Sequence, residues 1–238
     1  MSIKTTRRGY DPEDDKWFSR EAETKLFKAM EDFQYLLDRG YKSQPAIDFT
    51  GNHYLLSARQ RTAIQRSAAT QVQYEKRKAS MLPLENAKDG LISIDGFNLI
   101  ITLEVALSKS VLILGKDGVM RDLAGLKGTY KIIDKTEEAL NLIGSAVKKL
   151  SIPGIKFYLD SPVSNSGRLK KKILEQQDSW GIPVEVELTM NADKELCTLD
   201  RIVTGDSIVL DRCRSWVNLT RSIIDDYIKD AWIVSFEE

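Results

Sequence analysis

Short apolar segments alternate with segments of helical periodicity from residue 91 onward, and this alternation constrains the fold more than any other feature. Alternation of this kind predicts an α/β domain whose mostly parallel sheet is flanked by helices. The expected strands are Leu91–Ile94, Val111–Leu114, Ile155–Leu159, Val184–Leu188, Arg201–Thr204, Ile208–Leu210 and an edge strand Trp232–Phe236. The expected helices are Leu99–Ser108, Thr136–Leu150 and Gly167–Ser179.

The first part of the chain has a different pattern and predicts an α-helical N-terminal domain over residues 1–85, before an α/β domain over residues 90–238. Residues 14–39 carry an apolar stripe at helical spacing, and Ser43–Phe49 predicts a short helix. Ser57 followed by Gln60 has the form of a capping box, so a helix is expected from there to about Lys78. The segment Met81–Asp89 is interpreted as a linker.

The helix expected after Ser57 is the most basic part of the chain. At about 100° per residue, Arg59, Arg66 and Arg77 share one face, which could contact a phosphate backbone. Arg61 falls near the apolar stripe, so we expect it to reach a partner in the interior or at an interface. A solvated helix face is the alternative interpretation of these arginines.

Overall composition excludes several classes of site. Lys and Arg total 35 and Asp and Glu total 35, so any nucleic-acid surface must come from local patches. The single histidine, His53, excludes multi-histidine zinc sites, and Cys197 and Cys213 match no zinc spacing. Free cysteines and the lack of a long apolar run favour a cytoplasmic protein without a membrane span.

Aspartates follow three of the expected strands: Asp95, Asp160 and Asp206. The carboxyl ends of parallel strands meet at one edge of a sheet, where ligands bind, so these three side chains should converge. Asp193 or Glu195 could join them from a helix start. Clustered carboxylates repel one another unless a cation lies among them, and oxygen ligands suit Mg²⁺ or Mn²⁺. The alternative is that each aspartate is a turn residue.

The segment after Asp160 is a candidate anion site. Ser164, Asn165 and Ser166 precede an expected helix start, where hydroxyl groups and free N–H groups can bind a substrate phosphate. Arg168 follows with a run of lysines. The alternative is an ordinary helix cap followed by a solvated lysine face.

Two segments resemble motifs of PIN-like nucleases of the NYN type. IDGFNLI, from Ile94, resembles the opening D-G-x-N motif, and VTGDSIVLD resembles the closing segment, with Ser207 as its small polar residue. The resemblance covers roughly residues 91–211 and implies that Asp95, Asp160 and Asp206 are catalytic metal ligands, with Asn98 orienting the first of them or a phosphate. Asp193 matches less closely, and Asp117 or Asp122 could supply a further acid.

Over nearly its full length, the chain also resembles a prokaryotic family whose N-terminal part is known as domain of unknown function 434. The motifs LLDRGY, GNHYLLSARQR, RDLAGLKGTY and LDSPVSNSG carry this resemblance, which implies architecture more than activity. Together these features predict a Mg²⁺- or Mn²⁺-dependent nuclease acting on RNA. PIN-like domains often pair, so the resemblance also implies a possible homodimer. The alternatives are a non-catalytic RNA- or protein-binding module with the same fold, or a phosphatase acting on a small substrate.

Overall fold

The computed structural model describes residues 6–126 and 128–237, and a six-stranded parallel sheet forms the centre of the larger part of the molecule. Neighbouring strands pair in parallel throughout. In spatial order, the strands are β1 (Met81–Leu82), β8 (Trp216–Val217), β7 (Ile202–Val203), β2 (Ile92–Asp95), β5 (Ile155–Asp160) and β6 (Val184–Thr189). The protein is therefore a mixed α/β structure with a mostly parallel sheet, as the alternating pattern predicted.

The two faces of this sheet bury different sets of side chains, because successive residues of a strand point to opposite faces. Phe157 and Val203 belong to the core shared with one set of helices, while Tyr158 and Ile202 belong to a separate cluster. The first set is α6 (Gly96–Leu107), α7 (Asp134–Lys149), α8 (Ser166–Leu174), α9 (Gln177–Trp180) and α12 (Leu219–Tyr227). The second set is α10 (Ala192–Leu196) and α11 (Ser207–Leu210).

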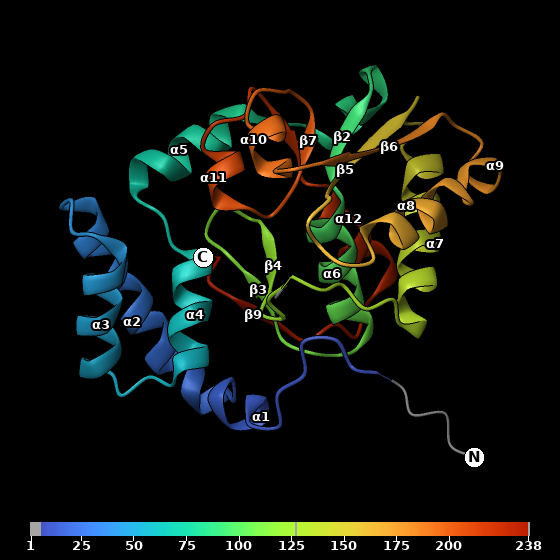
Figure 1. Cartoon of the computed structure of the whole chain (residues 1–238). Helices are drawn as coiled ribbons and strands as arrows, with labels where there is room; N and C mark the ends of the chain where they lie inside the picture. The colour runs from blue at the N-terminus through green and yellow to red at the C-terminus, as the bar shows by residue number, and fades with distance from the viewer. Residues whose placement is uncertain (1–5, 127, 238) are drawn as a thin grey trace, which may run out of the picture.

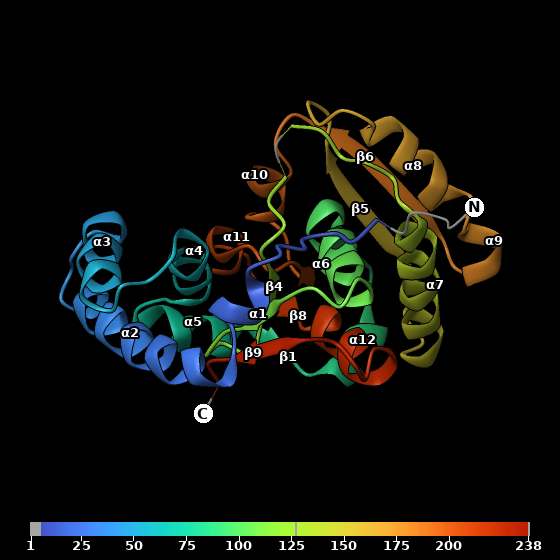
Figure 2. The same cartoon turned by 90° about the horizontal axis from the view of Figure 1, so that it is seen from below.

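A small second sheet joins the N-terminal helices to the rest of the molecule. Its strands are β4 (Met120–Asp122), β3 (Leu112–Leu114) and β9 (Ile233–Ser235), with β3 central. Ile113 and Val234 pack in the N-terminal core, whereas Leu112 packs in the core of the main sheet. The N-terminal helices are α1 (Asp14–Trp17), α2 (Arg20–Asp38), α3 (Ser43–His53) and α4 (Ala58–Ser67). Helices α2, α3 and α4 lie to the left of the small sheet in Figures 1 and 2, and α1 lies below it in Figure 1.

The helix predicted from Ser57 to Lys78 is divided in two. The capping box at Ser57 and Gln60 is present, but α4 ends at Ser67 and α5 (Gln71–Ser80) begins anew. The reason is a second capping box, in which the Thr70 hydroxyl accepts the N–H of Gln73 and the Gln73 side chain accepts the N–H of Thr70. The predicted common face of Arg59, Arg66 and Arg77 is therefore wrong, because the break turns α5 away from α4.

Other local expectations also need correction. The expected strand at 208–210 is the helix α11, because the Asp206 carboxylate accepts hydrogen bonds from the N–H groups of Ile208 and Val209. The predicted linker contains strand β1 of the main sheet and a 3₁₀ helix η1 (Leu84–Asp89). The last strand, β9, lies at the edge of the small sheet beside β3. Ser19 caps α2 and separates it from α1, which divides the helix expected over 14–39.

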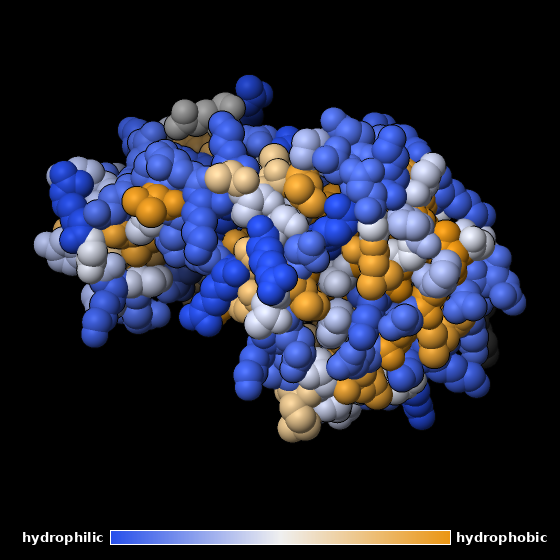
Figure 3. Space-filling model, turned by 90° about the horizontal axis from the view of Figure 1, so that it is seen from above, coloured by the Kyte–Doolittle hydropathy of each residue, from blue (hydrophilic) through white to orange (hydrophobic). Residues whose placement is uncertain are grey.

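None of the helices in the described part of the chain is long and apolar enough to cross a bilayer. On the face seen in Figure 3, apolar residues occur in small groups among hydrophilic ones. That face therefore offers no single large apolar surface.

Candidate metal centre

A pocket of about 160 Å³ opens at the carboxyl edge of the main sheet, and aspartates dominate its lining. It contains five of the six aspartates that the sequence nominated as possible acids, whereas the sixth, Asp117, pairs with Arg77 and Arg121 outside the lining. The five are Asp95, Asp122, Asp160, Asp193 and Asp206. Phe97, Ile101 and Leu126 supply apolar parts of the wall. Glu195, the alternative to Asp193, is not part of the lining.

Strand register explains why these aspartates meet. Asp95 ends β2 opposite Tyr158, and Asp160 ends β5 two residues further along. Residues that pair across parallel strands lie on the same face, so both carboxylates belong to the face that packs against α10 and α11. Asp193 lies in the first turn of α10, and Asp206 is the N-cap of α11. Four separate elements therefore deliver one carboxylate each.

Asp95 is the most buried of these four carboxylates, with 7% of its surface exposed. Its Oδ1 accepts the N–H of Asn98 at 3.2 Å, and its Oδ2 accepts the hydroxyl of Thr204 at 2.8 Å. The following Gly96 lies against β5, since a Cβ there would come within 2.6 Å of a Leu159 methyl group. Glycine therefore allows α6 to begin directly at the end of β2, with Asp95 as its N-cap.

Burial and mutual repulsion make the charged form of these carboxylates costly. Burial raises the pKa of Asp95 to about 7, and the charges of Asp193 and Asp206 add to the effect, although the Thr204 hydroxyl opposes it. Asp193 is exposed, but partial desolvation at the pocket raises its pKa to about 6, with further contributions from the charges of Asp206 and Asp160. A divalent cation between these groups would remove that penalty.

The pocket leaves carboxylate oxygens that a hydrated divalent ion could use. Asp160 and Asp206 each use Oδ1 to accept backbone N–H groups, from Ala192 and from the start of α11. No donor to the Oδ2 atom of either residue occurs in the described part of the chain. Within residues 6–126 and 128–237, no three acidic, histidine or cysteine side chains lie close enough to hold an ion directly. Mg²⁺ commonly keeps several water ligands and binds through one or two carboxylates, so water can fill these gaps.

Asp122 differs from the other four. Its Oδ1 accepts the N–H of Ala124 at 2.7 Å, and its Oδ2 accepts the Thr102 hydroxyl at 3.3 Å. It also lies 3.6 Å from Arg66, so its charge is already balanced. Asp122 is therefore a weaker candidate ligand than Asp95, Asp160, Asp193 or Asp206.

Three predicted substrate-binding residues lie at or beside the pocket. Arg66 reaches it from α4, and its Nη1 donates to the carbonyl of Asp122 at 2.6 Å. Asn98 lines the pocket, and its Oδ1 accepts the N–H of Gly205 at 2.6 Å. Ser207 follows Asp206, and its hydroxyl accepts a bond from Arg121 at 3.3 Å. Arg66 is the one cationic side chain among the described lining residues.

The other predicted substrate-binding arginines of the N-terminal helices have internal partners. Arg59 forms an ion pair with the buried Asp14 at 2.5 Å and donates to the carbonyl of Leu123. Arg61 donates to the carbonyl of Leu56 and to Asn52, at the end of α3. The structure therefore does not bring either arginine into the pocket.

The candidate anion site after Asp160 also lies outside the pocket lining. Ser164 pairs with Thr129, and Asn165 donates to the carbonyl of Tyr130 at 2.8 Å. Ser166 is buried and Arg168 is exposed at the start of α8. These contacts attach the loop to residues 128–130, which leaves Asn165 engaged within the fold.

Two contributors to the site escaped the sequence interpretation. Thr204 holds Asp95, and Arg121 holds the segment that carries Asp206 by donating to the carbonyl of Gly205 at 2.9 Å. Strand alternation offers a signal for Thr204, because it stands two residues after Ile202 and so points to the same face as Asp95. No local signal marks Arg121, since its partners are distant in sequence.

Comparison with known proteins gives a family without an assigned activity. The model described as Domain of unknown function (DUF5616) matches residues 84–222, more than half of the chain, and that described as Protein of unknown function (DUF434) matches residues 25–79. An uncharacterized protein of Methanocaldococcus jannaschii is 37% identical over 183 residues, which cover 77% of this chain and 88% of the relative. No solved structure matches the chain significantly. Neither family description mentions a PIN or NYN domain.

Proposed function

The chain belongs to the protein family described as Domain of unknown function (DUF5616), and from this premise we propose that it is a metal-dependent nuclease that hydrolyses RNA. The observation that carries the proposal is the pocket at the sheet edge, where Asp95, Asp160, Asp193 and Asp206 arrive from four elements. The matched region contains all four. The pKa values of Asp95 and Asp193 are raised, which supports a site that receives a cation.

Each group of the pocket has a role in this proposal. Mg²⁺ or Mn²⁺, when bound, supplies an activated water and neutralises charge on a phosphoryl group. Asp160, Asp193, Asp206 and the buried Asp95 would hold the ion, in part through its water ligands. Thr204 and the N–H of Asn98 keep the Asp95 carboxylate in one orientation.

Arg66 is proposed to bind the substrate phosphate. The Arg66 guanidinium lies in a pocket with five carboxylates and could bind the phosphate of a substrate whose other oxygens contact the metal ion. Arginine matches phosphate geometry and keeps its charge. Its position at the rim allows a phosphodiester to lie between it and the aspartates. The helical N-terminal region therefore contributes a residue to a pocket otherwise formed by the α/β region.

The finer assignment to PIN-like nucleases of the NYN type is part of the proposal. In its support, the order along the chain is strand-end Asp95, strand-end Asp160, helix-start Asp193 and Asp206 after a third strand. The resemblance to these nucleases favours RNA over DNA as the substrate.

The deciding experiment is cleavage of labelled single-stranded RNA, structured RNA and single-stranded DNA with Mn²⁺, Mg²⁺ or EDTA. We expect RNA cleavage that depends on the metal. Asp206→Asn should lower the cleavage rate by more than about 100-fold, because loss of a residue that only supports a metal ligand already lowers activity about 10- to 100-fold. Asparagine still caps α11, so the variant should keep its fold. The exposed Asp178→Asn serves as the matched control.

The principal alternative is a non-catalytic RNA- or protein-binding module. It is favoured by the spacing of the carboxylates, since no three groups in the described ranges hold an ion directly. Such a module would show no cleavage and no rise in thermal stability with Mn²⁺, whereas a metal site gains stability by mass action. Hydrolysis of p-nitrophenyl phosphate without RNA cleavage would instead indicate the small-substrate phosphatase.

Replacement of Arg66 by glutamine should weaken substrate binding more than it slows turnover. A hydrogen bond to a charged group contributes roughly 1.5–3 kcal/mol, so we expect KM for RNA to rise about tenfold or more. Arg66→Lys keeps the charge and should lose less. Steady-state kinetics of the wild type and both variants measure this, and an unchanged KM in Arg66→Gln would exclude a phosphate contact.

A further inference from the structure

The helix α11 is a single turn that carries the candidate ligand Asp206 at one end and Asp211 at the other. A helix this short has little stability of its own, so its place depends on what holds its ends. Both ends are held from outside the main sheet. The groups that hold them come from α5 and from strand β4.

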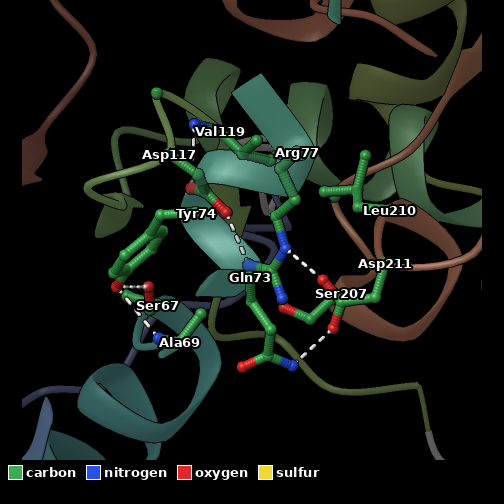
Figure 4. Close-up of polar contacts among 12 residues, drawn as sticks. Ser67, Ala69, Gln73, Tyr74, Arg77, Asp117, Val119, Ser207, Leu210 and Asp211 are labelled. Atoms are coloured by element: carbon green, nitrogen blue, oxygen red, sulfur yellow. Dashed lines mark hydrogen bonds and ion pairs between the residues drawn. The ribbon is translucent and has the colours of Figure 1, made fainter. Parts of the chain in front are cut away.

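The Asp211 end of α11 is bound by α5. The Asp211 carboxylate accepts a hydrogen bond from Gln73 at 2.7 Å and one from Nε of Arg77 at 2.6 Å. Figure 4 shows both side chains reaching Asp211, with the Arg77 guanidinium between Asp211 and Asp117. The Trp216 indole further fixes this part of α5 by donating to the carbonyl of Arg77 at 2.7 Å.

The Asp206 end of α11 is bound by Arg121 of β4. Its Nε donates to the carbonyl of Gly205 at 2.9 Å, and its Nη2 donates to the Ser207 hydroxyl at 3.3 Å. These two contacts bracket Asp206 in the sequence. Any shift of the Arg121 guanidinium would therefore move the backbone that presents the Asp206 carboxylate to the pocket.

Asp117 joins the two arginines. It accepts Nη1 of Arg77 at 2.8 Å, and both Nη atoms of Arg121 at 2.8 and 2.9 Å. The three side chains are at most 2% exposed, so the link is screened from water. Burial opposes ionisation of Asp117, but the charges of Arg121 and Arg77 outweigh it and lower its pKa. The carboxylate therefore stays ionised between the two guanidinium groups.

We propose that the chain of contacts from Arg77 through Asp117 to Arg121 positions Asp206, so that helix α5 sets the affinity of the aspartate pocket for a divalent ion. A buried ion network contributes little net stability compared with apolar residues of similar size. Its fixed geometry is what an apolar core could not supply. The inference rests on the proposed function, because it concerns the same pocket.

The test is the affinity for Mn²⁺, measured by calorimetry on the full chain without nucleic acid and checked by the Mn²⁺ resonance signal. Arg77→Met removes the contact between α5 and Asp117, and it leaves Gln73 bonded to Asp211 and Asp117 paired with Arg121. We expect it to weaken Mn²⁺ binding by about 10-fold or more, the usual effect of losing a group behind a metal ligand. Arg77→Lys, which keeps the charge, should restore part of the affinity.

The matched control is Arg8→Met, which breaks another ion pair of the N-terminal region, with Glu104, and does not touch α11. It should leave the Mn²⁺ affinity within about twofold of the wild type, even though it removes a partly buried charge pair. Equal Mn²⁺ affinity of wild type and Arg77→Met would overturn the positioning role while the metal site stands. A wild type that binds Mn²⁺ no better than Asp206→Asn would overturn the proposed function and this inference together.

Discussion

Replacement of Asp95 by asparagine is expected to raise the free energy of unfolding of the metal-free protein by about 2–4 kcal/mol at pH 8. The Asp95 carboxylate is buried, and its pKa rises to about 7 in the fold from an ordinary value of 3.8. Each tenfold change in proton affinity corresponds to about 1.4 kcal/mol, so an ionised Asp95 costs the fold up to about 4 kcal/mol. Asparagine has no charge to bury, and loses part of the bond to Thr204.

The same pKa predicts how the stability of the metal-free wild type depends on pH. The folded state binds the Asp95 proton more tightly than the unfolded state, so this group does not lower the free energy of unfolding below about pH 4. The cost grows as the pH rises from about 4 and is complete above the folded pKa of about 7. Stability due to Asp95 is therefore higher at pH 5 than at pH 8, and urea unfolding in EDTA at both values measures the difference.

Two comparisons make this result specific. The difference between pH 5 and pH 8 should shrink in Asp95→Asn and persist in the control Asp178→Asn, whose side chain is exposed. Addition of Mn²⁺ at pH 8 should stabilise the wild type by mass action and leave Asp95→Asn nearly unchanged. A variant that is less stable than the wild type at pH 8 in EDTA would show that the buried charge carries no penalty.

Replacement of Glu104 by alanine is expected to have the opposite effect and to destabilise the protein by about 3–5 kcal/mol, the usual cost of removing one partner from a buried ion pair. Glu104 is fully buried in α6. Its Oε1 accepts the hydroxyls of Tyr130 at 2.6 Å and Thr136 at 2.5 Å, and its Oε2 accepts Nε of Arg8 at 2.8 Å. Alanine would leave all three donors without this acceptor.

Urea unfolding of three variants tests this prediction. Glu104→Gln keeps an oxygen acceptor for the two hydroxyls but loses the charge opposite Arg8, so its loss should be smaller, about 1–2 kcal/mol. Glu138→Ala removes an exposed glutamate paired with Lys135 on α7 and should change stability by less than about 1 kcal/mol. Equal losses in Glu104→Ala and Glu138→Ala would mean that the buried network does not stabilise the fold.

The aspartate pocket could be predicted from the sequence because it depends on local patterns. An apolar strand that ends in aspartate places that side chain at the sheet edge, and parallel pairing brings such ends together. Asp95 and Asp160 follow this rule directly, and Asp193 and Asp206 follow it through helix starts. The helix break at residues 68–70 was missed, although the second capping box at Thr70 and Gln73 is a local signal that predicts it.

The partners of the arginines could not be predicted in this way. Arg59 and Arg77 looked like parts of one exposed basic face, yet Arg59 pairs with Asp14 and Arg77 pairs with Asp117 and Asp211. Asp211 is 134 positions from Arg77 in the chain. Helical periodicity predicts the side of the helix on which an arginine lies. It does not predict whether that side meets water or a buried carboxylate.

The amino-acid sequence by itself determined the α/β architecture and the edge at which Asp95, Asp160 and Asp206 lie, because strand alternation and helix caps act within a few residues. Only the tertiary structure decided which charges face the pocket. It left Arg66 at the pocket and enclosed Arg77 and Arg121 behind Asp206. Such pairings depend on elements that meet only after the small sheet and the N-terminal helices have packed against the main sheet. No local sequence pattern encodes contacts between residues so far apart in the chain.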